Sequence, residues 1–291
     1  MKNKLFLLSI ILLITKQFFL INNVNSSPIK NIKTDPNSNK RIVALTSLSA
    51  DVINTLSNES LIGIPGSSLF KGKNDFENKE IISSGRMPPN LEKIIKLNPT
   101  IVIGAEGFHD KTLKNLNSIG LKTKSLKIRN FNDLEKFYDD MNVYLKNKSN
   151  TKLKDKIPNC YTNDLAKNKK TNKVLLLASS KPILSPNSKS WSGNMLKRFK
   201  LENITSDLDS KSVFQGYATL SPEWILKSDP KNLIVIRTPG NNISQYENLN
   251  IWNNLNAVRN SRVFDFDYYG LINPGSLLSI DKACKKLITI K

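Results

Sequence analysis

With 291 residues, of which 39% are hydrophobic and 23% charged, the chain is long enough for one large or two ordinary domains and is globular, not disordered. Its formal net charge of +20 favours an anionic ligand or surface, but the lysines are scattered and form no compact basic motif, so we expect no nucleic-acid partner. One histidine and two distant cysteines exclude a zinc site built from Cys and His.

The first 26 residues have the pattern of a secretory signal peptide. A basic start is followed by the apolar residues 5–14 and by small residues at 24–26. Lys16 interrupts the apolar run, which makes it too short for a membrane span. No cysteine lies near the cleavage point, which argues against a lipid anchor. We therefore expect a periplasmic protein, cleaved near Ser26.

Strands and helices alternate after a polar lead-in over 27–40, and this alternation is typical of a parallel sheet. It predicts an N-terminal α/β lobe over residues 27–131. The expected strands cover residues 41–45, 61–64, 101–103 and 120–126, and a helix is expected over 112–119.

The stretch around residues 82–107 organises this lobe. Asn90 is a good helix N-cap, Glu92 falls in the first turn where the helix dipole favours an acid, and Asn98-Pro99 ends the helix. The β-branched run at 101–103 indicates a strand buried on both faces. The loop that follows it is the place where open α/β sheets bind ligands.

The same phrase recurs in the second half of the chain. Ser221 is the cap, Glu223 lies in the first turn, Asp229-Pro230 ends the helix, and 234–236 is the strand. Two copies so far apart predict two lobes built alike, and they do not fit a short-period solenoid.

Residues 132–171 differ from both lobes. Apolar residues recur there at helical spacing, with Pro158 as a kink, and no strand is visible. We interpret this segment as a single helix that connects the lobes. A C-terminal α/β lobe over 172–291 follows, with strands at 173–178, 234–236 and 261–266 and a final helix over 276–288.

Three motifs now point to a known family. The stretches RMPPNLEKIIKLNPTIVI and LSPEWILKSDPKNLIVI, and the tail IWNNLNAVRNSRVFDF with NPGSLLSIDKACKKL, resemble the solute-binding proteins of ABC importers for iron–siderophore complexes, cobalamin and haem. The resemblance covers nearly all of the chain after residue 26. It implies two Rossmann-like α/β lobes with parallel sheets, joined by one long helix, with the ligand in the cleft between them.

The resemblance also implies roles for single residues. Glu92 and Glu223 stand where such proteins pair with arginines of the permease. Arg86 stands at a cleft position that is arginine in ferric-hydroxamate binders, and its fork of donors suits an anionic or carbonyl-rich ligand. Tyr269 matches a cleft tyrosine, whereas Gln215 replaces a tryptophan of the hydroxamate binders.

Other cleft candidates come from loops next to predicted strands and from the polar segment KSWSG. Aromatic side chains there would give apolar contact to a bulky chelate. The complete set of expected ligand-binding residues is Arg86, Phe108, His109, Trp191, Gln215, Tyr217 and Tyr269.

The two cysteines, Cys160 and Cys284, are candidates for a disulfide because an exported protein meets an oxidising compartment. Cys284 resembles a disulfide-bonded cysteine of some cobalamin-binding relatives. Their partner position, however, holds Phe199 here, so the resemblance does not supply the pairing.

We expect a binding protein without catalytic residues, which carries an iron–siderophore-type complex to an ABC permease. A cobalamin or haem carrier is the alternative within this class, and a secreted α/β enzyme is the alternative outside it. The S-x-x-K matches at 68–71 and 149–152 fit chance in so Ser- and Lys-rich a chain, and a Ser-His-Asp triad would have to use His109. We expect a monomer with no cofactor and no metal.

Overall fold

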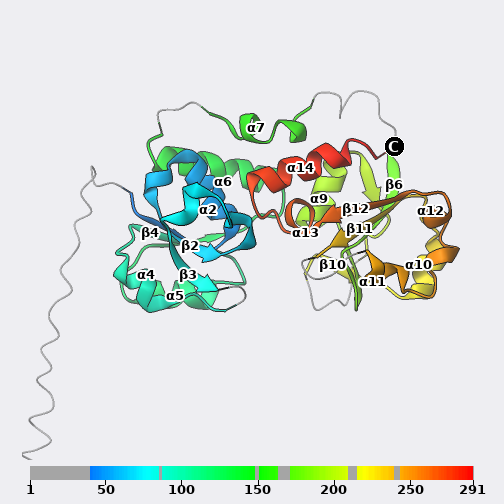
Figure 1. Ribbon diagram of the computed structural model, residues 1–291, viewed down its shortest axis with the longest axis horizontal. Helices are drawn as coiled ribbons and strands as arrows, with labels where there is room; N and C mark the ends of the chain where they lie inside the picture. The colour runs from blue at the N-terminus through cyan, green and yellow to red at the C-terminus, as the bar shows by residue number, and fades with distance from the viewer. Residues whose placement is uncertain are drawn as a thin grey trace, which may run out of the picture. The chain divides into compact units, whose positions relative to one another are not determined.

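The structure is a computed structural model, and it describes residues 40–84, 87–147, 151–162, 171–208, 215–238 and 243–290 (Figure 1). The predicted signal peptide over 1–26 lies outside these residues. Within them, we find no helix with the length and apolar character that a membrane span requires.

The N-terminal lobe is a five-stranded parallel sheet in the order β3-β2-β1-β4-β5, together with the helices between its strands. Its strands are β1 (Ile42–Ala44), β2 (Leu61–Gly66), β3 (Glu80–Ser84), β4 (Ile101–Ala105) and β5 (Thr123–Leu126). Its α-helices are α2 (Ser47–Leu56), α3 (Asn74–Glu77), α4 (Leu91–Lys96) and α5 (Asp110–Ser118), and two short 3-10 turns cover Asn58–Ser60 and Ser68–Phe70.

The C-terminal lobe contains a four-stranded parallel sheet in the order β12-β11-β6-β9. Its strands are β6 (Asn172–Leu177), β9 (Leu201–Asn203), β11 (Leu233–Arg237) and β12 (Val263–Asp267). Its helices are α9 (Trp191–Arg198), α10 (Pro222–Ser228), α11 (Ser244–Glu247), α12 (Asn256–Arg259), α13 (Tyr268–Leu271) and α14 (Leu277–Leu287), with a 3-10 turn at Trp252–Asn254.

This lobe also has a second, antiparallel sheet that the sequence did not predict. It has the order β10-β8-β7 and consists of β7 (Ser179–Ser180), β8 (Ile183–Pro186) and β10 (Tyr217–Thr219). The sheet stands directly after β6 in the chain, so it borders the carboxyl end of the parallel sheet.

The repeated phrase forms the same unit twice, a capped helix followed by a buried parallel strand. The Asn90 side chain accepts from the Lys93 amide at 2.9 Å, and the Ser221 hydroxyl accepts from the Trp224 amide at 3.2 Å. The strand of each copy pairs with the first strand of its sheet, β4 with β1 and β11 with β6. The predicted α/β class with two parallel sheets is confirmed.

The segment between the lobes is less continuous than the sequence suggested. Helix α6 (Phe131–Tyr144) begins with a capping box in which Asn130 and Asp133 bond each other's backbone amides. It ends where Lys146 adopts a left-handed φ of 51°. After it come a short helix α7 (Leu153–Lys156) and a 3-10 turn η3 (Pro158–Cys160), in place of the single helix predicted over 132–171. The predicted lobe boundaries stay predictions.

One apolar core joins the two lobes. A single cluster of buried side chains runs from α2 through α6, η3 and α9 to α14, while each sheet has a separate cluster on its other face. A polar bond reinforces the junction, because the Leu277 amide at the start of α14 donates to the Asp51 carboxylate of α2 at 2.8 Å. Residues Asn39–Lys291 accordingly form one compact unit.

Candidate functional site

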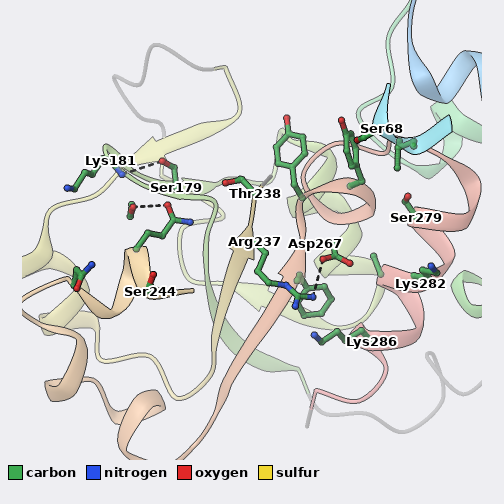
Figure 2. Close-up of a pocket in the computed structure, with 18 of the residues that line it drawn as sticks. Ser68, Ser179, Lys181, Arg237, Thr238, Ser244, Asp267, Ser279, Lys282 and Lys286 are labelled. Atoms are coloured by element: carbon green, nitrogen blue, oxygen red, sulfur yellow. Dashed lines mark hydrogen bonds and ion pairs between the residues drawn. The ribbon is translucent and has the colours of Figure 1, made fainter. Parts of the chain in front are cut away.

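Two cavities among the described residues contain predicted ligand residues, and the larger of these two, with a volume of about 1430 Å³, lies at the carboxyl ends of β11 and β12 (Figure 2). Arg237 at the end of β11, Thr238 just after it, and Asp267 at the end of β12 form its floor. Ser68 and Leu69 reach it from the N-terminal lobe. The carboxyl edge of an open parallel sheet is where such sheets bind ligands, so this cavity is the main candidate site.

Ion pairs stiffen the floor of this cavity. The Arg237 guanidinium contacts Asp265 at 3.1 Å and Asp267 at 3.0 Å, and the Lys286 ammonium contacts Asp265 at 3.1 Å. Partial burial would raise the pKa of Asp265, but Lys286 and Arg237 outweigh burial and hold that pKa below its ordinary value. Asp265 is therefore ionised at neutral pH and orients both cations.

Aromatic rings form one wall. Tyr268 and Tyr269 both line the cavity, with their ring centroids 5.3 Å apart in an edge-to-face arrangement. A Cβ atom on Gly275 would lie 2.6 Å from the Tyr269 ring, so glycine allows the ring to pack against the backbone there. The predicted cleft residue Tyr269 is therefore placed in the larger cavity.

The smaller cavity has a volume of about 220 Å³ and contains three more of the predicted residues, Trp191, Gln215 and Tyr217. The Gln215 side-chain oxygen accepts from Arg129 at 3.3 Å. Burial raises the pKa of the Tyr217 phenol to about 12, so this group is neutral at physiological pH.

Trp191 lies in a helix and not in the polar loop that the segment KSWSG suggested. It is the first residue of α9, whose N-cap is the Ser190 hydroxyl. Its indole N–H donates to the Gly270 carbonyl at 2.9 Å, and its ring stacks on Phe131 with centroids 5.0 Å apart. Because Gly270 follows Tyr269, this bond links the walls of the two cavities.

The other predicted ligand residues lie elsewhere. Phe108 is 76% exposed and, like His109, lines neither of these cavities. His109 is buried, and its Nδ1 accepts from the Ala105 amide at 3.0 Å. Burial lowers the pKa of His109, although Asp110 opposes this, so the ring is neutral and caps the end of β4. Arg86 falls outside the described residues and stays a prediction.

Glu92 and Glu223 are exposed in the first turns of α4 and α10. Figure 1 shows both helices along the lower edge, on the side away from α7 and α14. One helical turn after each glutamate stands an exposed apolar side chain, Ile95 at 46% and Leu226 at 40% exposure. The Glu223 backbone amide and the Ser221 hydroxyl lower the pKa of Glu223.

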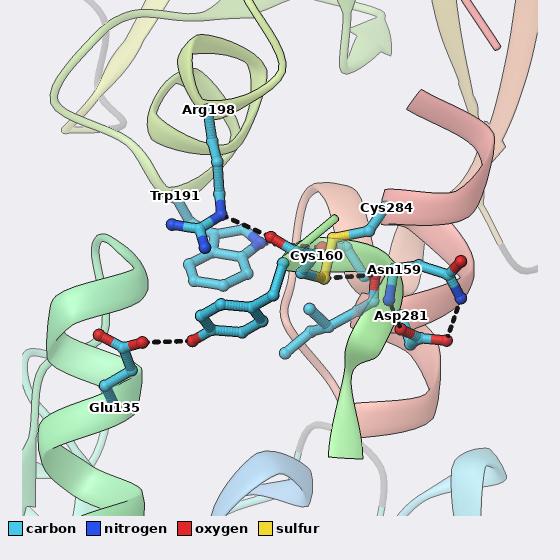
Figure 3. The surroundings of a disulfide bond; sticks show 10 residues. Glu135, Asn159, Cys160, Trp191, Arg198, Asp281 and Cys284 are labelled. Carbon is cyan, nitrogen blue, oxygen red and sulfur yellow. Dashed lines mark hydrogen bonds between the residues drawn. A yellow bond between two sulfur atoms is a disulfide. The ribbon is translucent and has the colours of Figure 1, made fainter. Parts of the chain in front are cut away.

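Cys160 and Cys284 form a disulfide between η3 and α14, with 5.1 Å between their Cα atoms (Figure 3). The Asn159 amide and side chain both donate to Asp281, at 2.9 and 2.7 Å, and hold the same two elements together. Phe199, which stands at the partner position of the cobalamin-binding relatives, is fully buried in the shared core.

Arg198 connects this disulfide to α6. Its Nε donates to the Cys160 carbonyl at 2.8 Å, and its guanidinium lies 4.5 Å from the Phe131 ring and 4.6 Å from the Tyr161 ring. The Tyr161 hydroxyl donates to Glu135 of α6. Three helices, α6, α9 and α14, are thus tied at one point.

Metal ligands do not gather anywhere in the part of the chain that the structure describes: no group of three or more His, Cys, Asp or Glu side chains is placed to hold an ion.

Residues 147–269 match the family model of periplasmic binding proteins. The fold agrees with solved members. A possible iron-binding (periplasmic solute-binding) protein from Staphylococcus epidermidis superposes with a TM-score of 0.67 at 20% identity, over 85% of this chain and 96% of that one. The resemblance to periplasmic binding proteins is confirmed.

Two further proteins show how far along the chain the similarity extends. The periplasmic vitamin B12 binding protein BtuF of Vibrio cholerae gives a TM-score of 0.61 at 16% identity, over 86% of this chain and 96% of BtuF. The Fe(3+)-citrate-binding protein YfmC of Bacillus subtilis is 28% identical over 194 residues, which are 62% of this chain and 58% of YfmC. The match therefore spans less than two thirds of YfmC.

Sequence reasoning missed the charged residues of the larger cavity. Arg237 directly follows the predicted strand 234–236, so the rule that ligands bind at strand ends was sufficient to find it. Lys181 and Lys282 also line the cavity. They belong to a two-residue turn and to the final helix, where no local pattern in the sequence indicates which side chains face a cavity.

Proposed function

We propose that this chain is the extracytoplasmic binding component of an ABC importer and holds a ferric siderophore-type chelate. The observation that carries the proposal is the cavity of about 1430 Å³ at the carboxyl edge of the C-terminal sheet, lined from both lobes. Its tyrosines suit a bulky ligand, and its charges suit one with polar groups on its surface. The similar proteins are named for iron, ferric citrate and vitamin B12, and these names support a metal chelate.

A cobalamin or haem ligand is the alternative within this class, and it has the same support from the fold. The enzymatic alternative has less support, because the described side chains of the cavity include no histidine or cysteine that could act as a base or nucleophile. His109, the chain's single histidine, lies outside the cavity.

A binding titration tests the ligand class. We expect quenching of intrinsic tryptophan fluorescence by a ferric chelate, because Trp191 adjoins the cavity wall through Gly270. Cobalamin and haem are titrated in parallel. Saturation by either of these, without response to ferric chelates, would assign the alternative. Arg86→Ala should weaken binding by roughly 1.5–3 kcal/mol if that side chain contacts the ligand.

We further propose that α4 and α10 dock on the permease. Each helix presents a glutamate and, one turn on, an exposed apolar residue, Glu92 with Ile95 and Glu223 with Leu226. Two matched pairs suit a membrane partner made of two like subunits. Arginines on that partner would bind each carboxylate through two parallel hydrogen bonds.

The docking proposal is tested in vesicles that contain the permease. The variant Glu92→Ala/Glu223→Ala should bind ligand normally in solution and fail to stimulate uptake. The control is Glu77→Ala/Glu202→Ala, which removes one exposed glutamate from each lobe outside the two helices. Normal uptake by the first variant would contradict the docking role. The glutamates would then serve only to stabilise their helices through the helix dipole.

A further inference from the structure

We propose that the larger cavity takes a chelate with carboxylates on two sides, and that Lys181 and Lys282 bind them from opposite walls. The inference rests on the proposed function, since it assumes that this cavity is the ligand site. It adds the chemical class of the ligand and two specificity-determining residues.

Among the described residues, four cationic side chains line the cavity, and two of them form ion pairs within the protein. Arg237 pairs with Asp265 and Asp267 at 3.1 and 3.0 Å, and Lys286 pairs with Asp265 at 3.1 Å. These two cations are compensated by the protein itself. A ligand anion would have to compete with Asp265 and Asp267 to bind them.

Lys181 and Lys282 are different. Both are exposed and both line the cavity, and neither ammonium group forms an ion pair with a carboxylate of the described residues. Lys181 stands in the turn between β7 and β8, whereas Lys282 stands on α14. Figure 2 shows them on opposite sides of the view, with Arg237 between them.

The position of Lys282 is fixed by its neighbours. Asp281 accepts two hydrogen bonds from Asn159, at 2.9 and 2.7 Å, and Cys284 is in the disulfide. These bonds hold α14 so that Ser279, Lys282 and Lys286, which are three and four residues apart, present one face to the cavity. Lys282 is therefore held on the cavity-facing side of α14.

Electrostatics then favour a particular ligand. Among the described residues, the four lining cations outnumber the lining Asp267 and the neighbouring Asp265, which leaves an excess of positive charge in a recess where field lines are focused and anions are attracted. A carboxylate at each end of a chelate would meet one uncompensated ammonium group and form a charge-assisted hydrogen bond. A chelate built only from hydroxamates, such as a trihydroxamate without carboxylates, would leave both lysines without an anionic partner.

The experiment compares two ferric probes on the full protein, ferric citrate and ferrioxamine B, a ferric trihydroxamate without carboxylates. Affinities are measured by tryptophan fluorescence. Lys181→Gln and Lys282→Gln should each weaken ferric citrate binding by roughly 10- to 100-fold, the loss of one charge-assisted hydrogen bond. Affinity for ferrioxamine B should not change. Lys285→Gln, an exposed lysine of α14 that does not line the cavity, is the matched control and should behave as the unmodified protein.

The outcomes separate the two proposals. Tight ferric citrate binding that neither lysine variant weakens overturns this inference and leaves the proposed function standing. Preference of the unmodified protein for ferrioxamine B does the same. Failure to bind any ferric chelate overturns both. Equal weakening of ferric citrate by Lys285→Gln also overturns the inference, because the effect would then come from net charge and not from the wall of the cavity.

Discussion

The two lobes share one strand arrangement but differ at the carboxyl end of the strand that follows the repeated motif. In the N-terminal lobe the strand of the repeated phrase, β4, pairs with β1 and β5; in the C-terminal lobe β11 pairs with β6 and β12. The strand ends differ. After β4, His109 folds back onto the strand, and a Cβ on Gly104 would lie 2.8 Å from it. At the end of β11, Arg237, the last residue of the strand, and Thr238, the residue after it, line an open cavity.

This difference shows that the repeated sequence motif determines the helix–strand unit of each lobe. It does not determine the residues that line a binding site. Cap, helix and buried strand are the same in both copies, while the residues that follow the strand decide whether its end is filled or open. Substitutions at matched positions of the two lobes, and at the contact between the lobes where no residues are equivalent, distinguish these two contributions.

The largest expected effect is at the junction. Replacing both Cys160 and Cys284 by serine removes the crosslink that closes a loop of 124 residues. The free energy of unfolding should fall by roughly 4–5 kcal/mol in the chain-entropy model. Urea unfolding measures it, and the unmodified protein treated with reductant is the control. Two free thiols in the denatured, unreduced protein would show that the bond does not form.

Matched core residues come next. Ile94 and Ile225 are each two residues after the glutamate of the phrase, and both are fully buried. Ile94→Ala and Ile225→Ala should each lower the free energy of unfolding by about 2–5 kcal/mol, by similar amounts. The exposed neighbours, Ile95→Ala and Leu226→Ala, should change it by less than about 0.5 kcal/mol. A large inequality between the two buried positions would break the comparison between the lobes.

The smallest effect concerns pH and only the N-terminal lobe, which holds the single histidine. Burial lowers the pKa of His109 below its ordinary value of 6.5, so the unfolded chain binds more protons than the folded one. Stability should therefore be lost as the pH falls below 6.5 and through the lower folded pKa. Unfolding of His109→Gln across pH 5–8 isolates this term: the stability difference between the two proteins should be constant above 6.5 and should decline below it. A difference that did not vary with pH would contradict the assignment.

The sequence predicted features that depend on neighbouring residues. Caps, proline stops and β-branched runs act within a few positions, and so both copies of the phrase were found with their strands. The antiparallel sheet was not predicted, because β8 pairs with β10, which is far along the chain, and both strands are short. Pairing of that kind is decided by tertiary contacts.

The candidate site was predicted less completely, for the same reason. Trp191, Gln215, Tyr217 and Tyr269 were selected from loops next to predicted strands and from the polar segment KSWSG, and they line one or the other of the two cavities. His109 was also selected by position, but its ring found a local partner in the Ala105 amide. Lys181 and Lys282 come from distant parts of the chain, and only the folded arrangement brings them to one cavity.

The shared core has a consequence for synthesis. Buried residues of α2, near the start of the described chain, belong to the same apolar cluster as Leu277 and Ile280 of α14, near its end. A chain that emerges N-terminus first can align β1 to β5 early, but the face of that sheet covered by the shared core stays partly open to water until α14 has emerged. The N-terminal lobe therefore cannot complete its core until the last residues of the chain are made. A product truncated before Leu277 would leave the apolar side chains of α2 exposed to water on the side that α14 normally covers.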